Sequence, residues 1–277
     1  CGVEGFEMSF RIVMLASGSK GNAALIINEK RYFLVDMGLS CRELVKRLSE
    51  LNVKAEQLTA LFITHEHVDH VKGLATFSKK YKVPIYSSER TWRAILARNS
   101  EILRSSCHII ATNIQYNNIR ITSFEIPHDA ADPHGYIFED VENGSKCCYL
   151  TDTGFVTETV RQAVEGAELL VLEANHDVEM LKNGRYPAVL KQRILSTRGH
   201  LSNDSAGWLL ANMKKKPRRV FLAHLSEENN RPKLALETVL KVLNEAGQKN
   251  DIDILVAAQH EIVGDYLPLE RSLFENL

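Results

Sequence analysis

Residues 59–70 read TALFITHEHVDH, and this stretch decides the fold and the chemistry. An apolar run that predicts a buried strand leads directly into His65, His67, Asp69 and His70. Imidazole nitrogens and carboxylate oxygens are the ligands that a divalent metal such as zinc prefers. Because alternate side chains of an extended segment share one side, the first three should lie together and His70 should point elsewhere. A single tetrahedral ion with one open position takes only three protein ligands. This segment alone offers four in six residues, so it predicts a two-metal site.

Outward from this stretch, short apolar strands alternate with amphipathic helices. We expect strands at residues 11–16, 23–28, 31–35, 59–64, 84–87, 120–126, 135–139, 146–150, 168–173, 218–223 and 253–257. We expect helices at residues 40–51, 70–80, 89–98, 157–165, 187–195, 203–213 and 231–246. Strands precede helices twice over with no linker between them, which predicts an α/β fold built as a four-layer α/β/β/α sandwich. The order of elements alone would also permit a doubly wound sheet, so the motifs must decide.

Composition excludes several classes of protein. The chain has 277 residues, with 34 Lys and Arg against 35 Asp and Glu, which rules out a strongly basic nucleic-acid coat but not a local basic groove. No apolar run reaches the roughly 18–20 residues of a membrane span, so we expect no membrane partner. Five irregularly spaced cysteines fit a reducing compartment, and we expect a cytoplasmic protein. We expect residues 1–7, before Met8, to be a leader or a vector-derived remnant, and residues 8–277 to form one domain.

Four further residues with ligand side chains follow apolar strands: Asp36, His128, Asp152 and His224. Strand ends at one edge of a sandwich can converge on a common site, with the sheets as a rigid platform. Each residue alone has a common structural role, since an Asp before Gly is usually a turn residue and a strand-end His is often a hydrogen-bonding group. Their ordered occurrence around the HEHVDH segment favours a shared site.

The HxHxDH pattern after an apolar strand resembles the signature of the metallo-β-lactamase superfamily. Four more segments resemble the other motifs of that family in the right order, and together they span most of the chain: VDMG at 35–38, PHDA at 127–130, TDTG at 151–154 and AHLS at 223–226. The resemblance implies the sandwich fold and two divalent ions, zinc or manganese, held about 3.5–4 Å apart to clamp both oxygens of an in-line displacement.

The resemblance also implies which residue does what. One ion would be held by His65, His67 and His128, and the other by Asp69, His70 and His224, with Asp152 and a hydroxide as bridges. Oxygen reductases of the superfamily carry a carboxylate at the position of His70. A histidine there resembles the hydrolases of the superfamily instead. We expect two buried acids, Asp36 and Glu173, to orient the ligands from behind, as carboxylates next to metal ligands do.

His200 lies in RGHLSND, at residues 198–204, directly before a predicted helix. A similar Gly-His-hydroxyl segment occurs in the tRNA-processing ribonucleases of the superfamily, where the histidine protonates the leaving oxygen. Imidazole suits that role, so His200 is a candidate catalytic residue. Asp69 is the second candidate. A structural place beside the helix N-terminus is the alternative. His176, in LEANHD, is a candidate contact to substrate phosphate or a support for a ligand.

Residues 182–198 read KNGRYPAVLKQRILSTR and carry five basic residues and no acid. Basic side chains beside a two-metal site suit a polyanionic phosphodiester, although a solvated helix face would have the same composition. The candidate substrate-binding residues of this segment are Lys182, Arg185, Lys191, Arg193 and Arg198.

The closer resemblance is to the YycJ/WalJ-like branch. It is carried by SGSKGN at 17–22, HEHVDH at 65–70, PHDAADPHGY at 127–136, LEANHD at 172–177, GRYPAVLKQRILSTRGHLSN at 184–203 and AHLSEENN at 223–230. The branch implies a cytosolic exonuclease that degrades DNA from 5′ ends and is linked to repair.

Three other functions compete. A tRNA 3′-processing endoribonuclease would carry a long arm between the third and fourth motifs, where this chain has only 23 residues between His128 and Asp152. A thioester or small-ester hydrolase, or a lactam hydrolase, would lack the basic 182–198 segment and the His200 segment. A non-enzymatic metal-binding module would not need the full ligand set. The sequence leaves the native metal, DNA against RNA, cleavage polarity and oligomeric state open.

Overall fold

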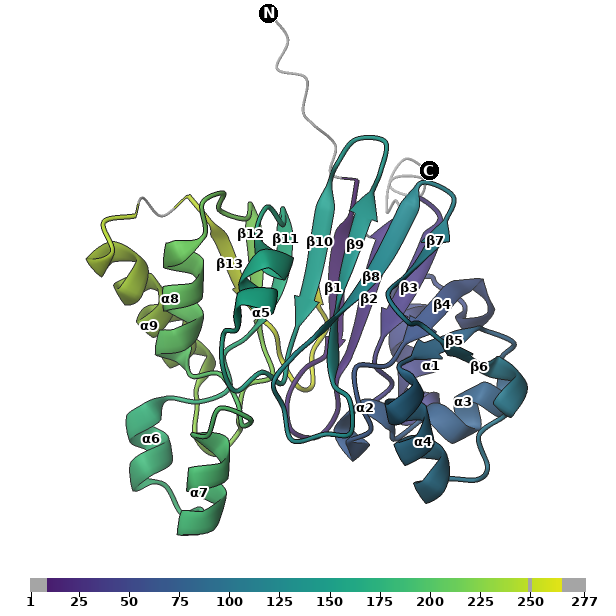
Figure 1. Ribbon diagram of the computed structural model, residues 1–277, viewed down its shortest axis with the longest axis horizontal. Coiled ribbons are helices and arrows are strands. Elements are labelled where there is room, and N and C mark those ends of the chain that lie inside the picture. The colour runs from purple at the N-terminus through teal and green to yellow at the C-terminus, as the bar shows by residue number, and fades with distance from the viewer. Residues whose placement is uncertain (1–8, 249–250, 266–277) are drawn as a thin grey trace, which may run out of the picture.

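The fold is the four-layer α/β/β/α sandwich that the sequence predicts (Figure 1). The computed structural model describes residues 9–248 and 251–265, so the expected leader at residues 1–7 lies outside the described residues. Two seven-stranded sheets pack face to face in the centre. In Figure 1, α1, α3 and α4 cover one sheet on the right, and α5, α8 and α9 cover the other on the left.

The first sheet has the strand order β14-β1-β2-β3-β4-β5-β6 and comes mainly from the N-terminal half. Its strands from β3 to β6 are parallel, so their carboxyl ends meet at one edge. The strands are β1 (Arg11–Ala16), β2 (Ala23–Asn28), β3 (Arg31–Val35), β4 (Leu58–Phe62), β5 (Ile85–Ser87), β6 (Cys107–Ile109) and β14 (Val263–Gly264).

The second sheet has the order β13-β12-β11-β10-β9-β8-β7. Its strands from β10 to β13 are parallel, with Leu150 beside Leu172 and Leu172 beside Leu222, so these strands end level with one another. The strands are β7 (Asn113–Tyr116), β8 (Ile119–Glu125), β9 (His134–Asp140), β10 (Lys146–Leu150), β11 (Leu169–Glu173), β12 (Arg219–Ala223) and β13 (Asp253–Val256).

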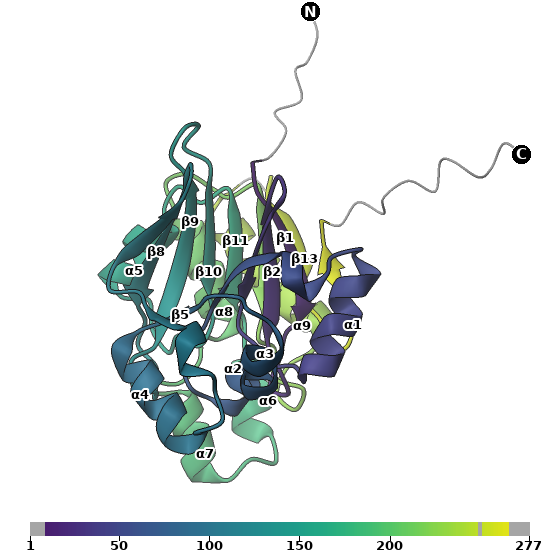
Figure 2. The same ribbon diagram turned by 90° about the vertical axis from the view of Figure 1, so that its right-hand side faces the viewer.

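The helices lie on the outer faces and at one end of the sandwich. Figure 2 shows α2, α4, α6 and α7 gathered at the lower end, beneath the strands. The helices are α1 (Cys41–Glu50), α2 (Val68–Val71), α3 (Leu74–Lys80), α4 (Glu89–Arg98), α5 (Glu158–Val164), α6 (Val178–Asn183), α7 (Ala188–Ile194), α8 (Asn203–Asn212) and α9 (Pro232–Glu245), with short 3₁₀ turns at Ala55–Gln57 and Arg104–Ser106.

The core has three apolar layers. The central layer, between the sheets, is rich in aromatic rings, among them Phe33, Phe62, Tyr136 and Phe138, which are fully buried. The outer layers join each sheet to its helices. Burial of side chains on both faces of each sheet explains why most strands read as unbroken apolar runs.

The structure differs from the sequence prediction in the short elements. The helix expected at 70–80 is two helices, α2 and α3, and the first begins within the HEHVDH segment. Strands β6, β7 and β14 and helix α6 were not predicted, because they are short and β6 and β7 are largely exposed. Within residues 9–248 and 251–265, no helix combines the length and the apolar character that crossing a membrane requires.

Candidate metal centre

The loops after five strands converge at one edge of the sandwich. Those after β3 and β4 come from the first sheet, and those after β8, β10 and β12 come from the second. They bring together all seven predicted metal ligands, in groups whose donor atoms lie within 4.8 Å of one another: His65, His67, Asp69, His70, His128, Asp152 and His224.

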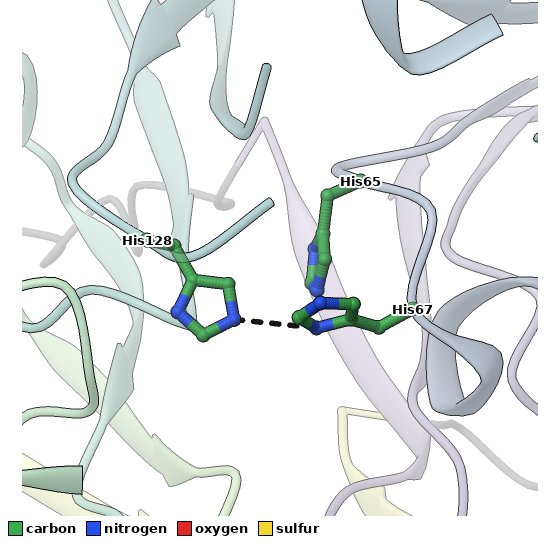
Figure 3. Close-up of side chains that lie close together, drawn as sticks. All are labelled: His65, His67 and His128. Carbon is green, nitrogen blue, oxygen red and sulfur yellow. Dashed lines mark hydrogen bonds between the residues drawn. The ribbon is translucent and has the colours of Figure 1, made fainter. Parts of the chain in front are cut away.

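The first donor group contains His65, His67 and His128 (Figure 3). The His128 Nε2 atom lies 3.4 Å from His67 Nδ1, and the rings of His65 and His67 are 4.5 Å apart. Neutral acceptors hold the outer nitrogens, since His128 Nδ1 lies 3.0 Å from the Gly199 carbonyl oxygen and His65 Nδ1 lies 3.0 Å from the Thr64 hydroxyl. These contacts leave one nitrogen of each supported ring facing the common point.

The second donor group contains Asp69, His70 and His224. The Oδ2 atom of Asp69 lies 3.3 Å from His70 Nε2 and 3.4 Å from His224 Nε2. The prediction that Asp69 shares a side with His65 and His67 is therefore wrong. The extended conformation ends at His67, where α2 begins, and the helical turn places Asp69 with His70 instead.

Asp152 lies between the two groups. Its Oδ2 atom is 3.3 Å from His70 Nε2, and its Oδ1 atom is 3.8 Å from His128 Nε2. Oδ1 is also 3.2 Å from His224 Nδ1. One carboxylate thus faces ligands of both groups, which is the position that a bridging ligand requires.

The donors fit divalent cations. His65 Nε2 and Asp152 Oδ2 are buried and have no hydrogen-bond partner among the residues that the structure describes. Leaving a buried polar atom unpaired costs about 1–3 kcal/mol, so two such atoms aimed into one cluster call for a partner. Imidazoles and carboxylates at this separation are the donor set that zinc or manganese takes.

The two groups differ in charge. Burial, reinforced by the neighbouring imidazoles, lowers the pKa of His65 well below the usual histidine range, and burial lowers the pKa of His128. Burial alone would also lower the pKa of His70 and His224, but the surrounding carboxylates outweigh it. They raise the pKa of His70 well above its usual range and that of His224 to about 10. Metal binding to the second group must therefore displace protons.

Two buried carboxylates orient the ligands from behind. Asp36 Oδ2 lies 2.7 Å from His70 Nδ1, and Asp36 Oδ1 accepts from the Thr64 amide at 2.9 Å. Glu173 Oε1 lies 2.9 Å from His224 Nδ1 and 2.8 Å from His200 Nδ1. Such contacts fix the ring orientation and make the imidazole a better ligand.

The backbone bends sharply where these side chains leave the strands. Asp36, Asp152 and His224 hold left-handed conformations with φ of 64°, 57° and 56°. This conformation costs on the order of 1–3 kcal/mol for a residue other than glycine. Gly38 allows the loop after β3 to pass directly beneath the ligand turn, since a Cβ atom there would lie 1.7 Å from the Asp69 carbonyl oxygen. Strained backbone concentrated at converging donors is typical of a functional site.

A cavity of about 240 Å³ opens at the donors, and His200 lines it. The His200 side chain is 20% exposed, and its Nδ1 atom lies 3.7 Å from Asp152 Oδ1. With Nδ1 held by Glu173, Nε2 is the nitrogen left for the cavity. His200, Asp152, Glu173 and His224 also offer donor atoms within 4.8 Å of one another, so the distances alone permit His200 as a ligand.

The basic residues of 182–198 occupy different places. Arg193 lines the cavity and pairs with Asp129. Arg198 donates to the His128 carbonyl oxygen at 3.2 Å. The others lie further out: Lys182 pairs with Glu179 at 3.0 Å, Lys191 donates to the Lys182 carbonyl oxygen at 2.7 Å, and Arg185 lines a separate hollow.

His176 does not occupy the position expected of a phosphate contact. His176 is only 1% exposed, and burial lowers the pKa of its imidazole to about 4. Neither ring nitrogen has a partner within the described part of the chain. The expected contact with substrate is thus not supported, because the ring is buried away from solvent.

Sequence reasoning missed several residues around the cluster. Asn22 donates to Asp69 Oδ2 at 3.2 Å, and Asn175 donates to the His224 carbonyl oxygen at 2.8 Å. Both lie in segments that carry the resemblance to the YycJ/WalJ-like branch, SGSKGN and LEANHD. That resemblance is the sequence feature that could have identified them. The cavity is also lined by Tyr186, Leu190 and Ile194. Apart from their spacing, nothing in the sequence indicated that they lie at the site.

Comparisons with known proteins show the family of the chain. The family model described as "Beta-lactamase superfamily domain" matches residues 31–225. The exodeoxyribonuclease WalJ of Streptococcus pneumoniae serotype 2 (strain D39 / NCTC 7466) is 39% identical over 257 residues, covering 90% of this chain and 94% of that protein. The exodeoxyribonuclease YycJ of Bacillus anthracis is 38% identical over 245 residues, covering 87% and 91%.

Solved structures share the fold at low identity. The metallo-beta-lactamase fold protein YhfI of Bacillus subtilis superposes with a TM-score of 0.68 at 16% identity, covering 92% of this chain and 99% of that one. The short form of human tRNase Z superposes with a TM-score of 0.62 at 18% identity, covering 93% and 99%.

The fold, the donor cluster and the family model together define a metal-dependent hydrolase. The chain belongs to the metallo-β-lactamase superfamily, in the branch that contains WalJ and YycJ.

Proposed function

We propose that this protein is a nuclease that hydrolyses DNA from 5′ ends, in a cytoplasmic role connected with repair. The observation that carries the proposal is the seven-ligand cluster in a chain 39% identical to a protein named exodeoxyribonuclease. The proposal includes two divalent ions, zinc or manganese, one in each donor group with Asp152 between them. It also includes one domain over residues 8–277.

The chain's own residues divide the work. Divalent ions at the two groups would supply a nucleophile derived from water and neutralise charge on the phosphate. Asp69 orients the second group through its contacts with His70 and His224. Asp152 sets the separation of the groups, because its two oxygens face different ligands.

His200 is the proposed proton donor. Glu173 lies 2.8 Å from its Nδ1 atom, which leaves Nε2 as the nitrogen for a substrate in the cavity that His200 lines. When the P–O bond to the leaving oxygen breaks, a proton on Nε2 passes to that oxygen, and the charge left there is neutralised. Proton transfer of this kind typically contributes about 10²–10⁴-fold to the rate.

Basic residues of the 182–198 segment are the proposed contacts to the nucleic-acid backbone. Arg193 at the cavity is the nearest candidate, with Arg198 beside the loop of His128. Lys182, Arg185 and Lys191 would contact phosphates further along a strand. Contacts of this kind position a nucleic acid without reading its sequence.

The test is purified protein with Mn²⁺ or Zn²⁺ on linear DNA labelled at the 5′ or the 3′ end, single-stranded and duplex, with matched RNA and closed circular DNA. We expect mononucleotide release from the 5′ end of linear DNA and no cutting of the circle. Circular DNA cut as fast as linear DNA would contradict exonuclease action. Faster turnover of thioesters or β-lactams than of any nucleic acid would contradict the nuclease proposal.

A further inference from the structure

One wall of the metal-site cavity is apolar. Most of the residues that line the cavity are polar and surround the donor cluster, but Tyr186, Leu190 and Ile194 line it from α7 and the residue just before its N-cap. Leu190 and Ile194 are four residues apart and share one side of α7, and Tyr186 joins them in the lining from just before the helix. Val189, at 78% exposure, points to solvent on another side. We call Tyr186, Leu190 and Ile194 the apolar wall.

The apolar wall is fixed to the catalytic side of the cavity. The amide of His200 donates to the Ile194 carbonyl oxygen at 3.0 Å. A Cβ atom on Gly199 would lie 2.1 Å from the same oxygen, so the end of α7 packs directly on the His200 loop. Arg193, on the same helix, pairs with Asp129, which follows the ligand His128. These contacts give the wall a defined position beside the donors.

We propose that the apolar wall binds the face of an unpaired nucleobase, with the ring of Tyr186 as the stacking surface, in the nucleotide next to the phosphate at the donor cluster. The inference rests on the proposed function. The donor cluster offers charged and polar groups to a phosphate, whereas the wall offers an aromatic ring and aliphatic side chains, with the Tyr186 hydroxyl as its one side-chain polar group, so it suits the base. Tyr186 and Leu190 are partly buried and keep surface towards the cavity.

The size and chemistry of the cavity set the specificity. About 240 Å³ is small among ligand pockets, which typically span about 300–1,000 Å³, so we expect the cavity to favour one base over a base pair. Every base has an aromatic face, so stacking tolerates any sequence. The site should therefore require an unpaired terminal base and ignore its identity.

The test compares oligonucleotides that carry a normal terminal nucleotide with ones that carry an abasic tetrahydrofuran residue there, at each end in turn. Wild-type protein should favour the normal end by about 5- to 150-fold in kcat/KM, the usual worth of one stacked base. Tyr186→Leu should remove this preference, mainly through KM, and leave the abasic substrate unchanged. Tyr186→Phe should keep the preference, because it keeps the ring.

Trp208→Leu is the matched control, because Trp208 is a half-exposed aromatic residue that lines a separate hollow with Phe155. It should behave as wild type. A preference that survives Tyr186→Leu, or one that Trp208→Leu removes, would overturn the inference. Unchanged turnover of the abasic end shows that Tyr186→Leu is folded. If wild-type protein degrades no oligonucleotide at all, the proposed function has failed, and that result appears before any variant is compared.

Discussion

The two halves of the molecule supply ligands in different ways. The N-terminal half provides His65, His67, Asp69 and His70 from one segment after β4, supported by a single carboxylate, Asp36. The C-terminal half, by which we mean the second sheet (β7–β13) and its helices, provides its ligands one at a time, from loops after β8, β10 and β12.

One buried carboxylate, Glu173, joins the scattered loops of the C-terminal half. Besides the two histidines, it accepts from the amides of Thr153 at 2.8 Å and Leu201 at 3.1 Å. The carboxylate of Asp36, by contrast, contacts only the 64–70 segment among the hydrogen bonds of the described residues. A contiguous ligand segment needs little outside help, whereas dispersed ligands depend on strand register and on a shared support.

The largest expected effect comes from the residue that both halves need. Asp152→Ala removes the carboxylate between the two donor groups, and we expect activity on DNA to fall by about 10³-fold or more. Metal content measured by elemental analysis should fall as well. Asp204→Asn, an exposed acid on α8, is the control. Activity within tenfold of wild type for Asp152→Ala would mean that the halves function separately.

His200→Ala tests whether the C-terminal half supplies a proton donor as well as ligands. We expect kcat to fall by about 10²–10⁴-fold with metal content and substrate affinity kept. The loss should shrink on a p-nitrophenyl phosphodiester, because nitrophenolate leaves without protonation. Loss of a metal ion would instead make His200 a ligand. Equal slowing on both substrates would assign it to stabilising charge on the phosphate.

Comparing Glu173→Gln with Asp36→Asn tests directly whether the dispersed ligands depend more on their supporting carboxylate than the contiguous ligands do. Both carboxylates use both oxygens, but Glu173 holds groups from several separate loops, so Glu173→Gln should weaken metal affinity or activity by about 100-fold. Asp36→Asn disturbs one segment and should cost about tenfold. Glu237→Gln, exposed on α9, is the control. A greater loss from Asp36→Asn would reverse the comparison.

The smallest effect concerns binding to the phosphate backbone. Arg193→Ala should reduce the slope of log affinity against log salt by about 1, because one phosphate contact is lost. Lys182→Ala, whose ammonium pairs with Glu179, should change the slope less. Binding isotherms on single-stranded DNA at several salt concentrations measure both. Equal slopes for Arg193→Ala and wild type would exclude Arg193 as a phosphate contact.

Whether ligands are contiguous or dispersed in the sequence also decided what the sequence could predict. The HEHVDH segment could be recognised as a metal site because its ligands are adjacent in the sequence. The order of strands and helices suggested the sandwich, and the motifs decided between it and a doubly wound sheet. The strand-end residues were predicted to share a site from their order around HEHVDH, and the family resemblance assigned their roles. No single segment shows that β10, β11 and β12 pair side by side. Alternation placed Asp69 with His65 and His67, which was wrong because α2 begins one residue after His67. The grouping that the resemblance implied, with His70 and His224, agrees with the structure.

The remaining features needed the tertiary structure. His176 reads as a polar residue after a strand, but its ring is covered by neighbouring loops. The 187–195 helix reads as basic, and only the placement of α7 shows that Leu190 and Ile194 face the cavity together with Tyr186. Residue types identify candidates, whereas burial and shared cavities depend on contacts between distant segments.

The most direct test of the central claim, that both halves build one two-metal centre, is the metal content of the purified chain. The protein is loaded with excess Mn²⁺ or Zn²⁺, freed of loosely bound ions and measured by elemental analysis. The account predicts two ions per chain. No more than one ion per chain, with metal supplied in excess, would contradict it.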